Sequence, residues 1–190
     1  MAYTPDGNNI IVGDDNGMVI KINLRTKRKV WQVKPYKNET RMYVRIRHLV
    51  VSPNGRYVAL GCRYQYYGEP KWMKILDCNT GRTINTIKKY SPNRNCYFRG
   101  KPTFICVVQL KFSRDSRFLF ALFAHEKTGN FGNCGVTKER YLMKINPLNG
   151  RTYWRYQVPI PAVSAPGIPT IPAYSCALPA PKFDVSYISN

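Results

Sequence analysis

The side chains that could act in acid–base or nucleophilic catalysis are few and scattered. His48 and His125 are the only histidines among the 190 residues, and neither belongs to a His-x-x-x-His pair or another catalytic pattern. No G-x-S-x-G motif, phosphate-binding P-loop or pair of carboxylates is present. We therefore predict that the chain is not an enzyme, and we expect no catalytic residue and no small-molecule substrate.

Two short motifs resemble ligand-binding loops. Gly129, Gly132 and Gly135 are spaced as G-x-x-G-x-x-G, but no helix is predicted after them whose N-terminus could hold a phosphate. Residues 14–17, Asp-Asp-Asn-Gly, match the start of a calcium loop without its later glutamate, and an Asn-Gly hairpin turn explains them. We expect no bound metal and no cofactor.

The six cysteines favour a reducing compartment. They contain no C-x-x-C pair of the kind that zinc sites need. Residues 1–9 lack the basic and apolar regions of a secretion signal, so free thiols are expected rather than disulfides. No apolar run approaches the roughly 18 residues of a membrane span. We expect an intracellular protein without a membrane span, in the cytoplasm or in an organelle.

Positive charge is the strongest chemical signal. Thirty Lys and Arg against ten Asp and Glu give a net charge of +20, which implies an anionic partner. Several of the basic residues lie in predicted connections among Tyr and Phe, and arginine beside aromatic rings suits phosphate contacts and base stacking. Lysine on strands could instead only block aggregation at sheet edges. The predicted polyanion-binding residues are Lys27, Arg28, Lys29, Arg41, Arg45, Arg47, Lys88, Lys89, Arg94, Arg99 and Lys101.

An internal repeat positions these residues. A Lys-Ile pair recurs at Lys21, Lys74 and Lys144, each time before a polar turn that ends near an arginine. Upstream of each copy, a turn of Asp or Asn beside Gly or Ser precedes an apolar strand, while helix periodicity is almost absent. The repeated lysines are interpreted as half-solvated residues of outer strands, which would line a rim with positive charge.

The repeat predicts an all-β chain of about three antiparallel four-stranded units, the first incomplete. Insertions are expected at 63–70 in the second unit and 124–138 in the third. The predicted strands are a stub at 1–3 with 9–13, 18–24 and 29–33; then 47–51, 56–62, 71–77 and 82–87; and then 105–112, 117–123, 140–146 and 152–158.

The repeated turns and strands resemble the blades of WD40-like β-propellers. Residues 52–59, Ser-Pro-Asn-Gly-Arg-Tyr-Val-Ala, and 75–82, Ile-Leu-Asp-Cys-Asn-Thr-Gly-Arg, are similar to the family's inner and outer strands, although its Trp-Asp and Gly-His pairs are absent. Residues 17–31 are also similar to quinoprotein-type repeats, and 141–154 less so. The resemblance implies a partial propeller at 1–158. Since closed propellers hold roughly 4–8 blades, a fragment of a longer chain or a propeller completed by partners is expected.

Residues 159–190 form a Pro-rich C-terminal tail. Seven prolines between Pro159 and Pro181 favour an extended polyproline II conformation, and we expect this tail to lie on neighbouring protein subunits. Alternatively, residues 183–188 could pair with an open edge of the chain's own sheets. The expected anchors in partner subunits are Ile168, Ile171, Tyr174, Leu178, Phe183 and Tyr187.

These features together predict a non-enzymatic scaffold subunit of a large assembly. Its basic surface would face a polyanion, and the RNA of a ribonucleoprotein is the favoured one. An acidic protein lattice such as a microtubule is an alternative, because Lys and Arg bind both kinds of partner. A fragment of a quinoprotein-type enzyme is the third reading.

Overall fold

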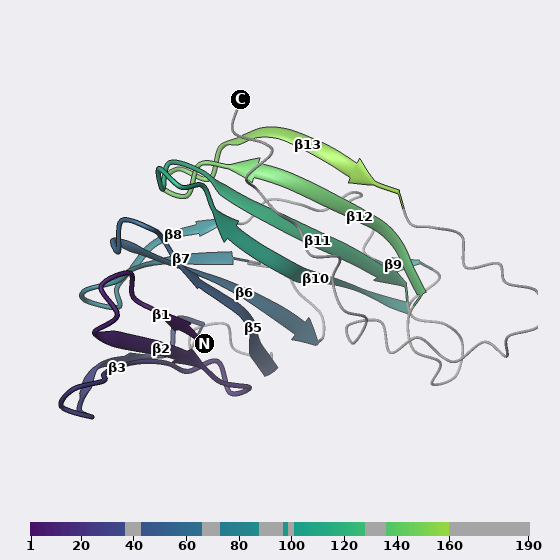
Figure 1. Ribbon diagram of the computed structural model, residues 1–190. Helices are drawn as coiled ribbons and strands as arrows, with labels where there is room; N and C mark the ends of the chain where they lie inside the picture. The colour runs from purple at the N-terminus through teal and green to yellow at the C-terminus, as the bar shows by residue number, and fades with distance from the viewer. Residues whose placement is uncertain (37–42, 66–72, 88–96, 99–100, 128–135, 160–190) are drawn as a thin grey trace, which may run out of the picture.

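Figure 1 shows the computed structural model of the chain, which describes residues 1–36, 43–65, 73–87, 97–98, 101–127 and 136–159. These residues form β-strands and turns and no helix. Nothing helical in these ranges has the length and hydrophobicity needed to cross a membrane. The prediction of an all-β chain is therefore confirmed.

The strands form three antiparallel units of four, each a meander in which successive strands pair. Unit one opens with a strand of two residues, as the stub in the sequence predicts. Unit one comprises β1 (Ala2–Tyr3), β2 (Asn9–Gly13), β3 (Val19–Asn23) and β4 (Lys29–Val33). Unit two comprises β5 (Tyr43–Val51), β6 (Tyr57–Gln65), β7 (Met73–Asp77) and β8 (Thr83–Ile87). Unit three comprises β10 (Lys101–Phe112), β11 (Leu119–Lys127), β12 (Val136–Ile145) and β13 (Thr152–Val158).

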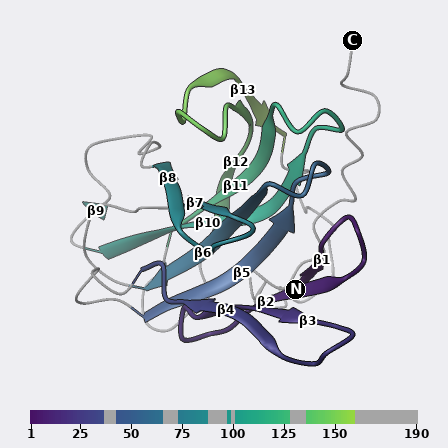
Figure 2. The same cartoon turned by 90° about the vertical axis from the view of Figure 1, so that its left-hand side faces the viewer.

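The units are arranged side by side like the sectors of a fan, with β1, β5 and β10 innermost and β4, β8 and β13 outermost (Figures 1 and 2). Units two and three share one sheet because Arg63 of β6 pairs with Cys106 of β10. The short strand β9 (Tyr97–Phe98) pairs with the start of β10. Unit one forms a separate four-stranded sheet.

Several strands are longer than the sequence predicts, all at the end away from the repeated turns. β6 continues to Gln65, β11 continues to Lys127 and β12 begins at Val136, so the predicted insertions are wrong over these residues. His125 therefore lies within β11, where it pairs with Ile105 and Glu139, rather than opening a loop. Pairing with neighbouring strands satisfies the backbone groups of these extensions.

A continuous apolar core fills the space between the units. Ile11 and Val19 of unit one, Val58 and Ile75 of unit two, and Leu119 of unit three are each fully buried in one cluster. Each is β-branched or a leucine placed by strand alternation on a face that packs against the next sheet. Burial of these faces fixes how neighbouring units pack.

The turns that the sequence repeats are held by the same hydrogen bonds in each unit. In the inner turns, the Ser52 hydroxyl accepts from the Tyr57 amide at 2.9 Å, and the Arg56 amide donates to Asn54 Oδ1 at 3.1 Å. In the outer turns, a side-chain oxygen at the last strand position accepts from a backbone amide three residues on, as between Thr80 N and Asp77 Oδ1 at 2.7 Å. The equivalent first residues are Thr4, Ser52 and Ser113 for the inner turns, and Asn23, Asp77 and Asn146 for the outer turns.

Candidate functional site

Six of the turns lie at the same end of the strands and form one surface, here called the turn face. An antiparallel four-stranded meander places its first and third turns at one end, so each unit contributes two turns. This end is on the left of Figure 1 and faces the viewer in Figure 2. Neighbouring units are in contact here, since the Asn54 amide donates to Ser116 Oγ at 3.0 Å. The turn face consists of residues 4–8, 24–28, 52–56, 78–82, 113–118 and 146–151.

The turn face is strongly basic. It carries eight Lys and Arg residues, all with exposed side chains, against three aspartates: Asp6 and Asp115 within it, and Asp77, which opens the second outer turn. The outer turn of every unit ends in an arginine, at Arg28, Arg82 and Arg151. The eight basic residues are Arg25, Lys27, Arg28, Arg56, Arg82, Arg114, Arg117 and Arg151.

The three aspartates at the turn face are already used within their own turns. The Thr4 hydroxyl donates to Asp6, the Thr80 amide donates to Asp77 and the Ser113 hydroxyl donates to Asp115, and these hydrogen bonds hold the pKa of all three carboxyl groups below their ordinary value. Asp115 also lies 4.0 Å from the guanidinium of Arg117, a long and exposed ion pair.

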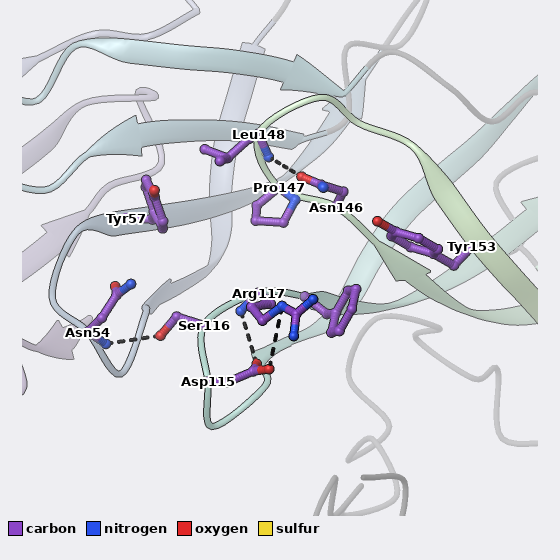
Figure 3. Close-up of a pocket in the computed structure, with 10 residues that line it drawn as sticks. Asn54, Tyr57, Asp115, Ser116, Arg117, Asn146, Pro147, Leu148 and Tyr153 are labelled. Carbon is purple, nitrogen blue, oxygen red and sulfur yellow. Dashed lines mark hydrogen bonds and ion pairs between the residues drawn. The ribbon is translucent and has the colours of Figure 1, made fainter. Parts of the chain in front are cut away.

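A pocket of about 270 Å³ opens on the turn face between units two and three (Figure 3). Asn54 and Tyr57 line it from unit two, and Arg117, Asn146 and Leu148 line it from unit three. Its wall combines amide groups, a guanidinium and apolar surface, which suits a ligand with both a charged and a flat apolar part.

Aromatic rings of unit three lie beside cationic groups at this pocket. The guanidinium of Arg151 lies 5.4 Å from the centre of the Tyr153 ring, which is 47% exposed. Phe118 meets Tyr153 edge to face at 5.2 Å, and the ammonium of Lys144 lies 4.0 Å from the Phe118 ring centre. Contacts of this kind orient the rings, and about half of the Tyr153 side chain still faces solvent.

The structure separates the predicted polyanion-binding residues into two places. Lys27 and Arg28 are on the turn face and Lys29 is at its edge, all three exposed. Arg45 and Arg47 are exposed residues of β5 near the opposite end, where Arg47 lies 4.0 Å from Asp15.

Arg45 and Lys101 fall outside the predicted strands, and the structure corrects this because they belong to β5 and β10. β5 begins at Tyr43 rather than at Arg47, since Val44 and Ile46, which alternate with the arginines, are buried in the core. Arg41, Lys88, Lys89, Arg94, Arg99 and the tail anchors Ile168, Ile171, Tyr174, Leu178, Phe183 and Tyr187 lie outside the described residues.

The interpretation of the repeated lysines as rim charges is wrong for Lys21 and Lys74. Lys21 is 6% exposed and donates to the Cys78 carbonyl of unit two at 3.1 Å. Lys74 is 8% exposed and donates to the Pro35 carbonyl at 2.6 Å, with its ammonium 4.7 Å from the Tyr36 ring centre. The stems of these lysines pack between the units while their ammonium groups reach backbone oxygens.

Other chemically active groups of the described residues do not assemble into a site. No cluster of three His, Cys, Asp or Glu side chains able to hold a metal ion occurs in the described ranges. Burial, with a smaller effect of Arg47, lowers the pKa of His48, and burial raises the pKa of the Cys78 thiol. A neutral imidazole and a protonated thiol are the forms expected at these interior positions.

No protein-family model matches the chain, but its fold is similar to that of solved structures. BamB from Moraxella catarrhalis has a TM-score of 0.50 at 15% identity, over 87% of this chain and 39% of that one. The C-terminal WD40 domain of Sif2 has a TM-score of 0.51 at 12% identity, over 82% of this chain and 35% of that one. The chain folds as WD40-like β-propeller blades.

The likeness concerns the fold, and the three units of this chain are its blades. The chain spans under two fifths of the length of each of these two solved structures. In each blade, the turn face holds the turn between the two inner strands and the turn between the two outer strands. The Arg at the end of each outer turn is evident in the sequence, but the position of Arg56, Arg114 and Arg117 beside them is not predicted from it. The alternation of turns between the two ends of a meander is the signal that could have done so.

Proposed function

We propose that the chain is a scaffold subunit of a macromolecular assembly whose turn face binds the sugar–phosphate backbone of single-stranded RNA. The observation that carries this proposal is the eight exposed Lys and Arg residues on one face against three aspartates that are already held in their turns. Phosphate contacts by Lys and Arg supply most of the sequence-independent affinity for nucleic acid. An arginine at the end of each outer turn offers contacts at intervals along a strand.

The exposed ring of Tyr153 favours a nucleic acid over other polyanions. The guanidinium of Arg151 lies over this ring, 5.4 Å from its centre, so a phosphate on the guanidinium would bring its base close to the exposed part of the ring. Stacking on an aromatic side chain is worth roughly 1–3 kcal/mol per base and is open to unpaired bases. An acidic protein offers carboxylates for the arginines but no planar base for the tyrosine.

The experiment compares two triple variants that remove the same charge from opposite ends of the blades. One variant is Arg28→Gln, Arg82→Gln and Arg151→Gln, on the turn face. The control is Lys34→Gln, Arg45→Gln and Arg47→Gln, three exposed residues at or near the other end, so the comparison also tests the sequence-based prediction that Arg45 and Arg47 bind the polyanion. Affinity for fluorescein-labelled oligouridine is measured by anisotropy over a range of salt concentrations. For single strands, each lost phosphate contact lowers the slope of log K against log salt by about 0.7.

We expect the turn-face variant to lower this slope by roughly 2 and the control to leave it unchanged. Equal slopes for both variants, or a fall in the control alone, would remove the turn face as the binding surface. Tyr153→Ala should weaken oligouridine binding and leave binding to polyglutamate unchanged. If polyglutamate binds as tightly as oligouridine and Tyr153→Ala changes neither, the partner is an acidic protein surface.

A further inference from the structure

The interface between units one and two and the interface between units two and three contain the same kind of polar contact. Trp31 Nε1 of unit one donates to the Cys78 carbonyl of unit two at 3.0 Å, and Asn85 Nδ2 of unit two donates to the Pro147 carbonyl of unit three at 3.1 Å. The two donors occupy the same place in their units. Trp31 pairs with Lys21 and Asn85 pairs with Ile75, and both Lys21 and Ile75 lie two residues before the residue that opens the outer turn.

The acceptors are equivalent too. Cys78 and Pro147 each follow directly on the residue that opens the outer turn, Asp77 or Asn146. The blade interface of this chain is thus built by a side-chain donor on an outer strand and a backbone oxygen on the outer turn of the next unit. The Trp31 contact is buried and the Asn85 contact is partly buried, so leaving either partner unmatched is costly.

Unit three carries the donor half of a third interface. Trp154 pairs with Lys144, two residues before Asn146, which repeats the pairing of Trp31 with Lys21. Strand alternation directs Lys144 and Trp154 to the face of unit three that is turned away from unit two. No carbonyl among the described residues accepts a hydrogen bond from either side chain. Lys144 and Trp154 are only half-buried, whereas the equivalent Lys21 and Trp31 are 6% and 9% exposed.

The surroundings of this donor pair are apolar. Phe118 and Trp154 pack against a small buried cluster of Phe120, Leu122 and Leu142, which is separate from the main core. Unit one uses Ile11 and Val19 in the corresponding places to pack against unit two. The face therefore repeats both the apolar and the polar parts of an interface that exists within the chain.

Unit one carries the acceptor half. Leu24 follows Asn23 at the start of the first outer turn, so its carbonyl corresponds to those of Cys78 and Pro147. The face of unit one turned away from unit two is also apolar, with Ile10 and Ile22 partly buried, Val30 50% exposed and Tyr3 60% exposed. One chain thus holds both halves of a further interface, one on the outward face of unit one and the other on the outward face of unit three.

We propose that a second copy of this chain docks head to tail, with Lys144 and Trp154 of one copy donating to the Leu24 carbonyl of the other. Two copies joined in this way at both ends present about six blades, which lies within the roughly 4–8 of closed propellers. The two contacts are then related by a two-fold axis, so the ring closes without leaving an unpaired face.

The test is the oligomeric state of the nuclease-treated full chain, measured by sedimentation velocity over a range of concentrations. Salt of about 0.3 M screens the repulsion between two strongly basic copies. We expect a dimer of twice the 21.9 kDa chain mass. Lys144→Met with Trp154→Phe keeps the packing and removes both donors, and should weaken dimerisation at least about tenfold. Gln157→Ala, an exposed residue of the same strand, is the control that should leave it unchanged.

A second variant tests the head-to-tail arrangement. Val30→Glu places a charge on the face of unit one and should also abolish the dimer, while an equal mixture of this variant with the Lys144→Met, Trp154→Phe variant should recover part of it through one intact contact. Thermal melting of each variant confirms that it is folded. A monomer at every concentration, or a dimer that Val30→Glu leaves unchanged, would overturn the proposal.

Discussion

Lys21 Nζ and Trp31 Nε1 donate to the same backbone oxygen, that of Cys78, at 3.1 and 3.0 Å. The two side chains face each other across β3 and β4, and the oxygen belongs to the outer turn of the next unit. The blade interface therefore depends on a polar contact within an apolar layer, because Lys21, Trp31 and Cys78 are all buried.

We expect the two donors to be coupled in their effect on stability. Lys21→Met and Trp31→Phe each leave one donor on the Cys78 carbonyl and should each lower the free energy of unfolding by about 1 kcal/mol. The double variant leaves this oxygen without a side-chain donor and should cost more than the two single changes together. Urea unfolding of all four proteins measures the coupling, and additivity within roughly 0.3 kcal/mol would show that the shared acceptor is unimportant.

Gly81 should be less tolerant of a side chain than Gly7. Both residues have left-handed backbone angles, with φ of 74° and 70°. A Cβ at Gly81 would lie 3.0 Å from the Trp31 ring, whereas a Cβ at Gly7 would meet no atom within 4 Å. Gly7→Ala should cost about 1 kcal/mol from backbone strain alone, and Gly81→Ala should cost roughly 1–3 kcal/mol more because the ring must move. Equal melting temperatures for the two variants would contradict this packing argument.

Acid should destabilise the fold through the turn aspartates. Hydrogen bonds from Thr4 to Asp6, from Thr80 to Asp77 and from Ser113 to Asp115 hold the pKa of all three carboxyl groups below the ordinary value of 3.8. Their contribution to stability is therefore complete above about pH 4 and is lost as the pH falls through the lowered pKa values. Replacing all three by Asn should flatten this loss, measured by urea unfolding between about pH 5 and pH 3.

Asparagine is a suitable replacement because the chain already uses it at equivalent positions. Asn54 accepts the same inner-turn hydrogen bonds, and Asn23 and Asn146 accept the outer-turn ones. If the triple Asn variant loses stability in acid as steeply as the parent chain, other groups must cause the loss. His48 is one such group, since its lowered pKa means that its own contribution is lost below about pH 6.5.

Removal of residues 159–190 should leave the three units folded and abolish incorporation of the chain into its assembly. The sequence-based reason is that the Pro-rich tail has too little regular apolar pattern to form a core but is already extended for docking. Circular dichroism and thermal melting report the fold, and copurification with the assembly reports docking. Unfolding or aggregation of the shortened chain would instead show that the tail closes an edge of its own sheets.

The turns and most of the strands can be predicted from local sequence alone. Hairpin chemistry is local: an Asx side chain and a glycine with positive φ act within about five residues, so Asp77 and Gly81 predict their turn without help from the rest of the chain. The prediction of three antiparallel units followed from the recurrence of these turns. The same locality explains why β2, β4 and β13 have their predicted bounds.

The direction in which the repeated lysines point depends on the folded structure. Lys21 precedes its turn-opening residue Asn23 by two positions, whereas Lys74 precedes Asp77 by three, and a shift of one residue turns a strand side chain to the opposite face. Lys21 therefore reaches forward to unit two and Lys74 reaches back to Pro35. An aligned Lys-Ile pair in the sequence conceals this difference, because the face on which a side chain lies depends on its register to the turn.

The basic turn face and the blade interface also arise only when the chain folds. Arg28, Arg82 and Arg151 are separated by more than fifty residues each, and the alternation of antiparallel strands brings them to one end. Trp31 and Cys78 are 47 residues apart and meet because two sheets pack face to face. The sequence contains the residues of each contact, but packing between units decides which of them meet, since that depends on burial of whole sheet faces rather than on any local pattern.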